Sequence, residues 1–410
     1  MTVRTTEAHG GVDSPAAWFR LVVAMAISTI GGVGMWSIMV ALPTIQADFG
    51  VSRADASLPF TMVMFGFAGG GVLMGRLADR FGIAVPLALG TLAVSVGYLA
   101  TGWSASLWQV ASAHLLIGIG CSSSFGPLMA DMSHWFVRRR GIAVSLAAVG
   151  NYVAGTLWPP VLQYFISASG WRATHVGVGL FCLVTMMPLV LFMRRRIEDH
   201  HTEEAGAAAA QRQANMPVSP MTLQVLLCVA GVCCCVAMSM PQVHIVAYCG
   251  DLGYGVARGA EMLSMMLGFG IISRVASGFI ADRIGGVRTL LLGSVLQGSA
   301  LFLYLWFDAL ISLYVISALF GLFQGGIVPS YAIIVREYFS PREAGTRLGI
   351  VLMATLLGMA LGGWLSGLIF DLTGSYRAAF FNGIAWNLVN VSIMVWLLHR
   401  SRRRGQLAAA

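Results

Sequence analysis

The 410-residue chain contains no lysine, and only 10% of its residues are charged. A soluble domain carries about 25% charged residues, so this chain cannot cover its surface for water in the usual way. Because 57% of the residues are hydrophobic and 49 are glycines, the composition predicts a protein that lies mostly in lipid. Its net charge of +8 comes from arginines that fall between apolar segments, which argues against nucleic acid as a partner.

The chain also lacks the motifs of an enzyme or a metal protein. No P-loop or GxGxxG follows a predicted strand, and no nucleophile and base are paired by their spacing, so we expect no catalytic activity and no cofactor. The seven cysteines lie in apolar runs, where they act as small hydrophobic side chains. Three of them, Cys233–Cys235, are consecutive and could not direct three thiolates to one metal. Residues 1–16 lack the basic-then-apolar pattern of a cleavable signal peptide.

Twelve apolar segments of membrane-spanning length, about 20 residues or more, can be drawn along the chain. They cover approximately 18–43, 57–78, 84–103, 107–136, 140–167, 172–193, 220–249, 257–281, 287–306, 309–338, 344–371 and 376–399. Charged, Ala-rich residues separate the sixth segment from the seventh. The pattern predicts an all-α membrane protein with a tail at 1–17, six-helix bundles at 18–193 and 220–399, a linker at 194–219 and a tail at 400–410.

The arginines predict the orientation of these segments, because the cytoplasmic connections of membrane proteins are rich in basic residues. If both termini are cytoplasmic, 20 of the 25 arginines fall on the cytoplasmic side, and four fall outside at positions 53, 172, 258 and 377. The reverse orientation would give the opposite bias. We therefore expect a multi-pass integral membrane protein with both termini in the cytoplasm.

The two halves of the chain repeat each other. The sequence GRLADRFG at 75–82 matches GFIADRIG at 278–285, with an offset of 203 and five of eight positions identical. The same offset relates Gly118 to Gly321, and Trp171-Arg172-Ala173 recurs as Tyr376-Arg377-Ala378. An even number of spans in each half makes the halves parallel repeats. That arrangement is typical of transporters whose substrate site lies at the midplane between the halves.

One arginine, Arg274, lies inside a span. The eight residues from it to Asp282 cover about 12 Å at about 1.5 Å per residue, which places Arg274 near the middle of a hydrocarbon core about 30 Å thick. A charge there is costly unless it faces a cavity or a partner. The alternative is a structural arginine neutralised by a buried acid, but Asp131, Asp251 and Glu261 are expected at other depths. We expect Arg274 to bind an anionic substrate, because a guanidinium holds a carboxylate through two parallel hydrogen bonds.

The paired GxxADRxG segments resemble the loop signature of the major facilitator superfamily, whose fold has twelve transmembrane helices in two pseudo-symmetric six-helix bundles. In that family the loop Asp and Arg latch the cytoplasmic helix ends and govern gating. The resemblance implies this role for Gly75, Asp79, Arg80, Gly82, Gly278, Asp282, Arg283 and Gly285. Helix capping and anchoring at the cytoplasmic surface are the alternative roles of the motif.

Within that superfamily, three stretches are similar to the monocarboxylate transporters and their bacterial relatives: residues 135–143 with Gly150-Asn151, residues 243–248 with Asp251 and Gly253, and the spacing from Arg274 to Arg283. In that family the helix 8 arginine binds the substrate carboxylate. The related oxalate/formate exchangers add a lysine in helix 11, which is missing here and argues against a dicarboxylate. Gly270 stands where mammalian members place an aspartate, so their usual proton relay is not expected.

The resemblance also implies that helices 1, 4, 7 and 10 line the cavity. His244 in helix 7 is therefore a candidate for substrate binding and for proton coupling, since histidine titrates near neutral pH; helix packing is the alternative. The other candidate substrate contacts are Ser122, Ser123, Asn151, Tyr152, Gln324 and Tyr331. Serines in membrane helices more often bond their own backbone or allow helices to pack closely, which is the alternative for Ser122 and Ser123.

These features predict a secondary active transporter that moves a small monocarboxylate anion across a bacterial inner membrane by alternating access, with proton symport. An organic-anion exchanger and an efflux transporter for amphipathic compounds are the alternatives. A receptor with a transporter fold is a further possibility from another class, and it would bind a substrate without moving it. Membrane lipid and the transported ions are the expected partners, and the sequence carries no indication of the oligomeric state.

Overall fold

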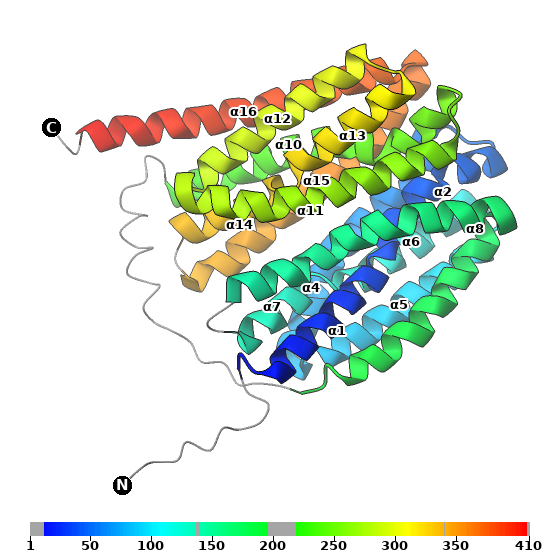
Figure 1. Ribbon diagram of the computed structural model, residues 1–410, viewed down its shortest axis with the longest axis horizontal. Helices are drawn as coiled ribbons and strands as arrows, with labels where there is room; N and C mark the ends of the chain where they lie inside the picture. Colours follow the sequence, from blue (N-terminus) through cyan, green and yellow to red (C-terminus); the bar gives the residue numbers. More distant parts are fainter. Residues whose placement is uncertain (1–11, 137–139, 196–218, 340, 408–410) are drawn as a thin grey trace, which may run out of the picture.

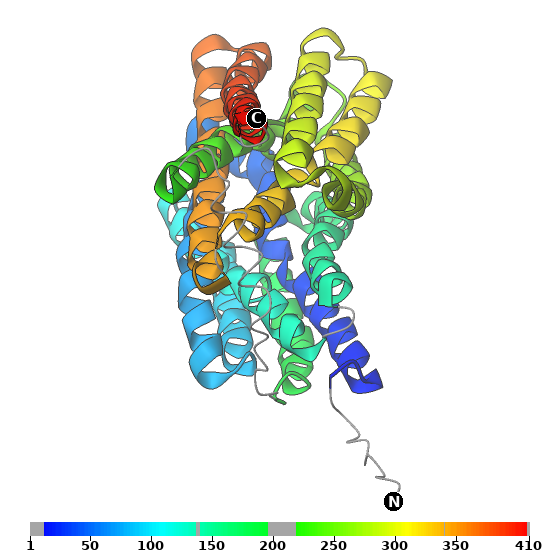
Figure 2. The same cartoon turned by 90° about the vertical axis from the view of Figure 1, so that its left-hand side faces the viewer.

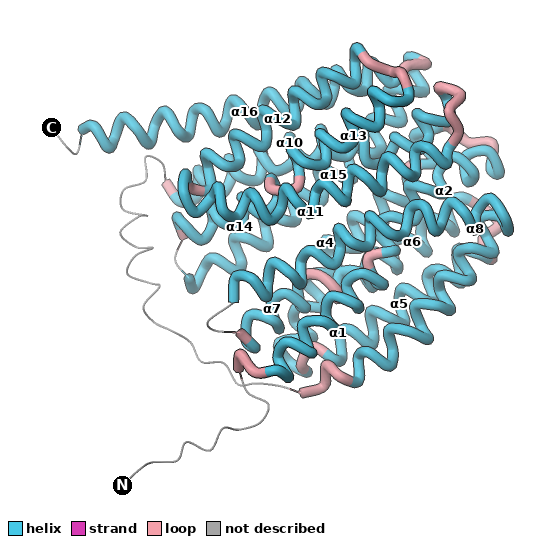
Figure 3. The backbone as a smooth tube through the Cα atoms, in the orientation of Figure 1, coloured by secondary structure: helices cyan, strands magenta, loops and turns pink. Residues whose placement is uncertain are grey.

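The computed structural model describes residues 12–136, 140–195, 219–339 and 341–407, so most of the expected tails and linker lies outside the described residues. The described chain is helical with short connections and contains no strand (Figure 3). The helices of the first half are α1 (Pro15–Gly31), α2 (Val33–Phe49), α3 (Arg53–Ala56), α4 (Leu58–Phe81), α5 (Ala84–Gly102), α6 (Leu107–Ser122), α7 (Gly126–Trp135) and α8 (Arg140–Leu191). Those of the second half are α10 (Pro220–Asp251), α11 (Val256–Ile284), α12 (Gly286–Trp306), α13 (Leu310–Gln324), α14 (Ile327–Tyr338), α15 (Pro341–Thr373) and α16 (Tyr376–Leu407).

Eleven helical segments of the described chain are long and apolar enough to cross a membrane. One of them, Ile142–Leu191, has 50 residues and would be about 75 Å long as a straight helix, more than twice the thickness of a hydrocarbon core. It reverses direction at Gly170, whose φ of 78° lies in the left-handed region that favours glycine (Figure 1). This segment therefore supplies two crossings, which brings the described chain to twelve. The fold is all-helical, as predicted.

The two halves lie side by side, with α1–α8 in the lower part of Figure 1 and α10–α16 in the upper part. Within the halves, α4 packs on α6 and α10 packs on α15. Across the halves, α8 packs on α11 and α4 packs on α15. The start of α1 and the end of α16 lie on one side, which faces the viewer in Figure 2. We call this side, where the two GxxADRxG segments end, the motif end, and the opposite side the far end.

The sequence repeat is also a repeat of packing. At Gly118, an added Cβ would lie 2.2 Å from the carbonyl oxygen of Val63, and at Gly321 it would lie 1.9 Å from that of Met266. Both members of the second contact follow those of the first by the 203-residue offset. Glycine at these positions lets α4 and α6, and likewise α11 and α13, bring their backbones together, as small residues do in membrane helices.

The GxxADRxG segments are helical, which corrects the expectation that they form loops. They form the last two turns of α4 and α11, which run to Phe81 and Ile284. The final glycines end the helices, because Gly82 has φ of 84° and Gly285 has φ of 82°, which side chains other than glycine adopt at a cost.

Three spans are interrupted part of the way across. The first breaks between α1 and α2 at Gly32, the fourth between α6 and α7 at residues 123–125, and the tenth between α13 and α14 at Gly325-Gly326. These are three of the four spans that were expected to line the cavity. The remaining one of the four is the seventh span, α10, which is continuous but contains Pro241.

Candidate functional site

A cavity of about 620 Å³ lies between the two halves. It is lined from the first half by residues of α2, α4, α6, α7 and α8 and from the second by residues of α10, α11, α14 and α15. Gly75, Arg76 and Asp79 of the first motif lie on its wall, as do Gly345 and Gly349 near the start of α15. Since these residues belong to the motif end, the cavity opens toward that end.

Arg274 lies on the cavity wall in the middle of α11. Its Nη1 donates to the carbonyl oxygen of Ala148 at 3.3 Å and its Nε to that of Gly325 at 3.5 Å. Its guanidinium carbon stands 4.3 Å from the centre of the Tyr152 ring. Both hydrogen bonds are long, and a guanidinium has five N–H donors, so the described residues leave most of its donor capacity unused.

Arg274 forms no ion pair with any residue in the described part of the chain. The acids considered as counterions are engaged elsewhere: Asp131 pairs with Arg20 at 2.9 Å, and Asp251 pairs with Arg53 at 3.0 Å. Glu261 pairs with Arg258 on its own helix at 3.1 Å. Arg274 is therefore a cation on the cavity wall that has no carboxylate partner among the described residues.

The repeat counterpart of Arg274 is Gly71, at the 203-residue offset. Gly71 also lines the cavity, and a Cβ added there would meet nothing within 4 Å. The two equivalent positions thus supply one charged side chain and one open space to the same cavity.

Tyr152 and Asn151 line the cavity from α8. Trp36 of α2 donates from its indole nitrogen to the Asn151 backbone oxygen at 3.1 Å and to the side-chain oxygen at 3.3 Å. Gly270 explains how Tyr152 comes so close to α11, because a Cβ at that position would lie 2.4 Å from the tyrosine ring. An aspartate at position 270 would collide with this ring in the present arrangement.

The remaining candidates are divided between the cavity and the packed interior. Ser122 lines the cavity, but its hydroxyl donates to the Ile119 carbonyl at 2.7 Å. Ser123 does not line it, and bonds the Gly120 carbonyl at 2.8 Å. Both serines therefore follow the alternative reading in which the hydroxyl bonds its own helix. Gln324 is buried behind Gln242, a lining residue that donates to it at 3.1 Å, and Tyr331 is fully buried outside the cavity lining.

His244 does not line the cavity, which is contrary to the expectation for helix 7. Its Nε2 lies 2.8 Å from the carbonyl oxygen of Gly363, and its Nδ1 lies 3.3 Å from the Tyr376 hydroxyl. A carbonyl can only accept, so Nε2 carries the proton and Nδ1 accepts from Tyr376. The histidine is fully buried and joins α10 to α15 and α16 near the far end.

The far end of the cavity is closed by contacts between the halves, which the sequence did not predict. Arg53 of α3 holds both carboxylate oxygens of Asp251 at 3.0 and 3.2 Å, and its Nη1 also donates to the Tyr376 hydroxyl at 2.6 Å. The Asp371 carboxylate accepts from the backbone nitrogens of Arg53 and Ala54 at 2.8 and 2.7 Å, which favours the N-terminus of α3. We call Arg53, Asp251, Asp371 and Tyr376 the far-end clasp.

The two motif segments differ in their surroundings. Arg80 lies over the ring of Phe81, with 5.1 Å from its guanidinium carbon to the ring centre, and both residues are exposed at the motif end. Asp282 and Arg283 are exposed at the end of α11. Only the first motif therefore reaches the cavity wall among the described lining residues.

A central cavity between two repeated helical halves, open at one end and clasped at the other, is typical of membrane transporters. The Major Facilitator Superfamily model matches residues 24–312 and 269–409. The chain belongs to this superfamily of secondary transporters, which is not a family of enzymes.

The relatives share this fold across most of their length. The chain is 28% identical over 353 residues to monocarboxylate transporter 13 of Bos taurus, covering 84% of this chain and 79% of that one. It is 25% identical over 344 residues to the MFS-type transporter opdF of Penicillium oxalicum, covering 82% and 79%. Among solved structures, a bacterial homologue of the human lysosomal transporter Spinster, in an inward-facing and occupied conformation, matches with a TM-score of 0.71 at 14% identity over 97% of each chain. The nucleoside transporter NupG matches with a TM-score of 0.71 at 12% identity, covering 93% of this chain and 99% of that one.

Proposed function

We propose that this transporter moves a monocarboxylate anion and that Arg274 binds its carboxylate. The observation that carries the proposal is a cavity cation without a carboxylate partner among the described residues. A bound carboxylate would supply the missing negative charge and take up the unused donors of the guanidinium. The distant similarity to monocarboxylate transporters supports the same substrate class.

The arginine bias assigns the motif end to the cytoplasm, so the conformation described is the inward-facing one under this proposal. Arg274 contacts α8 through Ala148 and Tyr152, and thus reaches from the second half to the first. A carboxylate that binds here would contact both halves at once, which is what a substrate needs in order to bias their rocking motion.

Proton symport remains part of the proposal, because one proton with one carboxylate would make transport electroneutral. Arg274 cannot carry this proton, since a guanidinium stays protonated. Among the described lining residues, Asp79 is the one carboxylate, whereas His244 is separated from the cavity. An organic-anion exchanger would use the same binding arginine without a proton.

Counterflow in proteoliposomes with labelled C2–C6 monocarboxylates tests the binding role. We expect Arg274→Gln to lose about 3 kcal/mol or more of binding, about a hundredfold or more in affinity, because two charge-assisted hydrogen bonds disappear. Arg258→Gln is the matched control, since this arginine is exposed on the same helix and pairs only with Glu261 among the described residues. Transport by Arg274→Gln at the wild-type rate would refute the assignment.

The same vesicles separate the mechanisms. Under symport, an inward-directed proton gradient drives accumulation from empty vesicles, whereas an exchanger requires a second anion on the opposite side. An efflux transporter for amphipathic compounds is favoured by one observation, the methionines Met35, Met238, Met353 and Met359 in the wall, because methionine adapts to varied apolar ligands. Counterflow only with anions that carry a large apolar body would support that alternative.

A further inference from the structure

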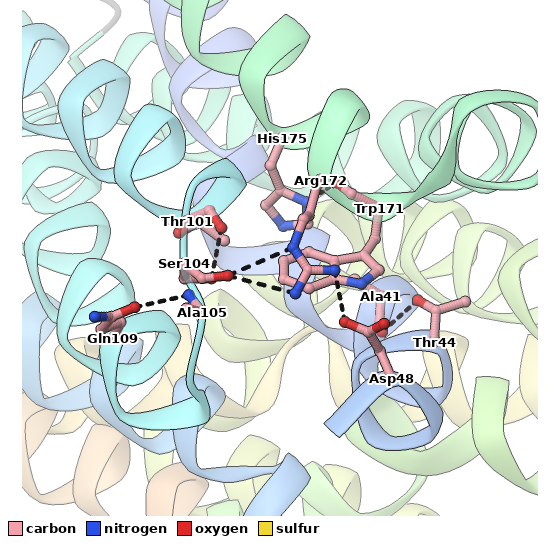
Figure 4. A network of polar contacts seen from close by, with 10 residues as sticks. All are labelled: Ala41, Thr44, Asp48, Thr101, Ser104, Ala105, Gln109, Trp171, Arg172 and His175. Carbon is pink, nitrogen blue, oxygen red and sulfur yellow. Dashed lines mark hydrogen bonds and ion pairs between the residues drawn. The ribbon is translucent and has the colours of Figure 1, made fainter. Parts of the chain in front are cut away.

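The far end of the first half contains an ion pair whose counterpart can be sought at the equivalent positions of the second half. Arg172, at the start of the second limb of α8, donates from Nη1 to the Asp48 carboxylate at 2.6 Å (Figure 4). Its Nε and Nη2 both donate to the backbone oxygen of Ser104, each at 3.4 Å. One arginine thus holds a helix-connecting segment with two nitrogens and a carboxylate with the third.

The second half repeats the carboxylate position and the arginine that binds one carbonyl oxygen through two nitrogens, but not the ion pair. Asp251 follows Asp48 by the 203-residue offset, and each is two residues before a glycine of positive φ, 61° at Gly50 and 81° at Gly253. Arg377 is the counterpart of Arg172 in the repeated aromatic-Arg-Ala sequence. Its Nε and Nη2 both donate to one carbonyl, that of Leu305, at 3.2 and 2.9 Å.

Nη1 of Arg377 has no carboxylate partner in the described part of the chain, and Asp251 is held by Arg53 from the other half. Asp251 and Arg377 are nevertheless attached to adjoining helix ends. Tyr248 of α10 packs on Tyr376 of α16 with ring centres 5.3 Å apart, and the Tyr376 hydroxyl shares the Arg53 guanidinium with Asp251.

We propose that Asp251 exchanges partners during the transport cycle. With the far end closed it pairs with Arg53, and with the far end open it pairs with Nη1 of Arg377, as Asp48 pairs with Arg172. When the halves rock as rigid bodies, Arg53 leaves with the first half, while Asp251 and Arg377 stay together on the second. The exchange gives the carboxylate an arginine in both states and lowers the free energy of the open state.

Spin labels on Ser169→Cys and Leu372→Cys test the exchange by pulsed electron–electron distance measurement, because both positions are exposed at the far end of opposite halves. Six of the seven native cysteines are buried, and the protein without introduced cysteines gives the background. The ratio of long to short distances reports the far-end-open population. The result is independent of the substrate, so it is separate from the test of Arg274.

Arg377→Gln keeps an amide donor for the Leu305 carbonyl but removes the charge. We expect it to lower the far-end-open ratio roughly two- to fivefold, the size of an exposed ion pair. In the Asp251→Asn background the same substitution should have no further effect. Arg172→Gln is the control, because the Arg172–Asp48 pair lies within one half and should not affect opening.

Two results would overturn the exchange: an open population unchanged or raised by Arg377→Gln, or a decrease of equal size in the Asp251→Asn background. If the wild-type open population is too small to measure, the comparison is made with Gly367→Leu, whose side chain would collide with the Arg53 carbonyl and with Cα of Ala54, at 2.9 and 3.0 Å from the Cβ position. We expect that substitution to force α3 off α15 and to populate the open state. The change in the open population caused by Arg377→Gln can then be measured.

Discussion

Replacement of Arg53 by glutamine should open the far end of the transporter. The substitution removes the two-pronged bond to Asp251, the bond to the Tyr376 hydroxyl, and the position of the guanidinium carbon 4.7 Å from the centre of the Phe370 ring. The Arg53 side chain is only 8% exposed, whereas that of Asp251 is 37% exposed, so the ion pair is partly screened by water. Allowing for this screening, we expect a loss of about 2 kcal/mol from the closed state.

That loss corresponds to about a thirtyfold increase in the ratio of open to closed molecules. Thr61→Cys provides the assay, because Thr61 is buried where α4 meets α15 and its hydroxyl donates to the Ala360 carbonyl at 3.3 Å. A membrane-impermeant maleimide added from the outside should modify this cysteine only when the far end opens. In a population that is mostly closed, the labelling rate is proportional to the open fraction, so it should rise about thirtyfold.

Arg172→Gln in the same Thr61→Cys protein is the matched control, since it removes an exposed arginine at the same end without affecting contacts between the halves. Its labelling rate should equal that of the reference. If Arg53→Gln also leaves the rate unchanged, the clasp does not set the conformational equilibrium, and the contacts of α4 with α15 must do so instead.

Two further predictions concern stability. Gly321→Ala should lower the thermal midpoint in detergent by several degrees, because its Cβ would lie 1.9 Å from the Met266 carbonyl and overpacking costs about 1–3 kcal/mol. Gly71→Ala should leave the midpoint unchanged, because the added Cβ meets nothing within 4 Å. Equal midpoints for the two variants would refute the role of close backbone packing. Asp131→Asn should lower the free energy of unfolding further, by about 3–5 kcal/mol, because it leaves the 3%-exposed Arg20 without its carboxylate. A thermal midpoint within a degree of wild type would contradict that reasoning.

The fold was predictable because membrane spans are encoded locally. Twenty or so apolar residues in succession predict a crossing, and the repeated GxxADRxG segments predict the twofold arrangement. Arg274 was predictable for the same reason, since a lone charge inside an apolar run has few physical explanations. The structure places it on the cavity wall, and its role as the carboxylate ligand stays a prediction.

His244 could not be placed from sequence because every residue of α10 from Cys233 to Cys249 is buried. A helix that is apolar and buried all round has no amphipathic stripe to distinguish a cavity-facing side from a packed one. The far-end clasp was missed for a different reason. Arg53 and Asp251 are 198 positions apart, and the sequence around each residue does not indicate which residue it pairs with.

The interruptions in the first, fourth and tenth spans have a mechanical consequence. In an unbroken helix the backbone hydrogen bonds transmit a tilt from one end to the other, whereas at a break fewer of these bonds join the two parts, which can then tilt relative to each other. The parts on the motif side, α7 and α14, contribute Gly126 and Val328 to the cavity wall and begin just beyond the breaks. They can swing inward to narrow the mouth while α6 and α13 remain packed by their glycine contacts. The breaks therefore allow bending within each half at the motif end, in addition to rotation of one half against the other.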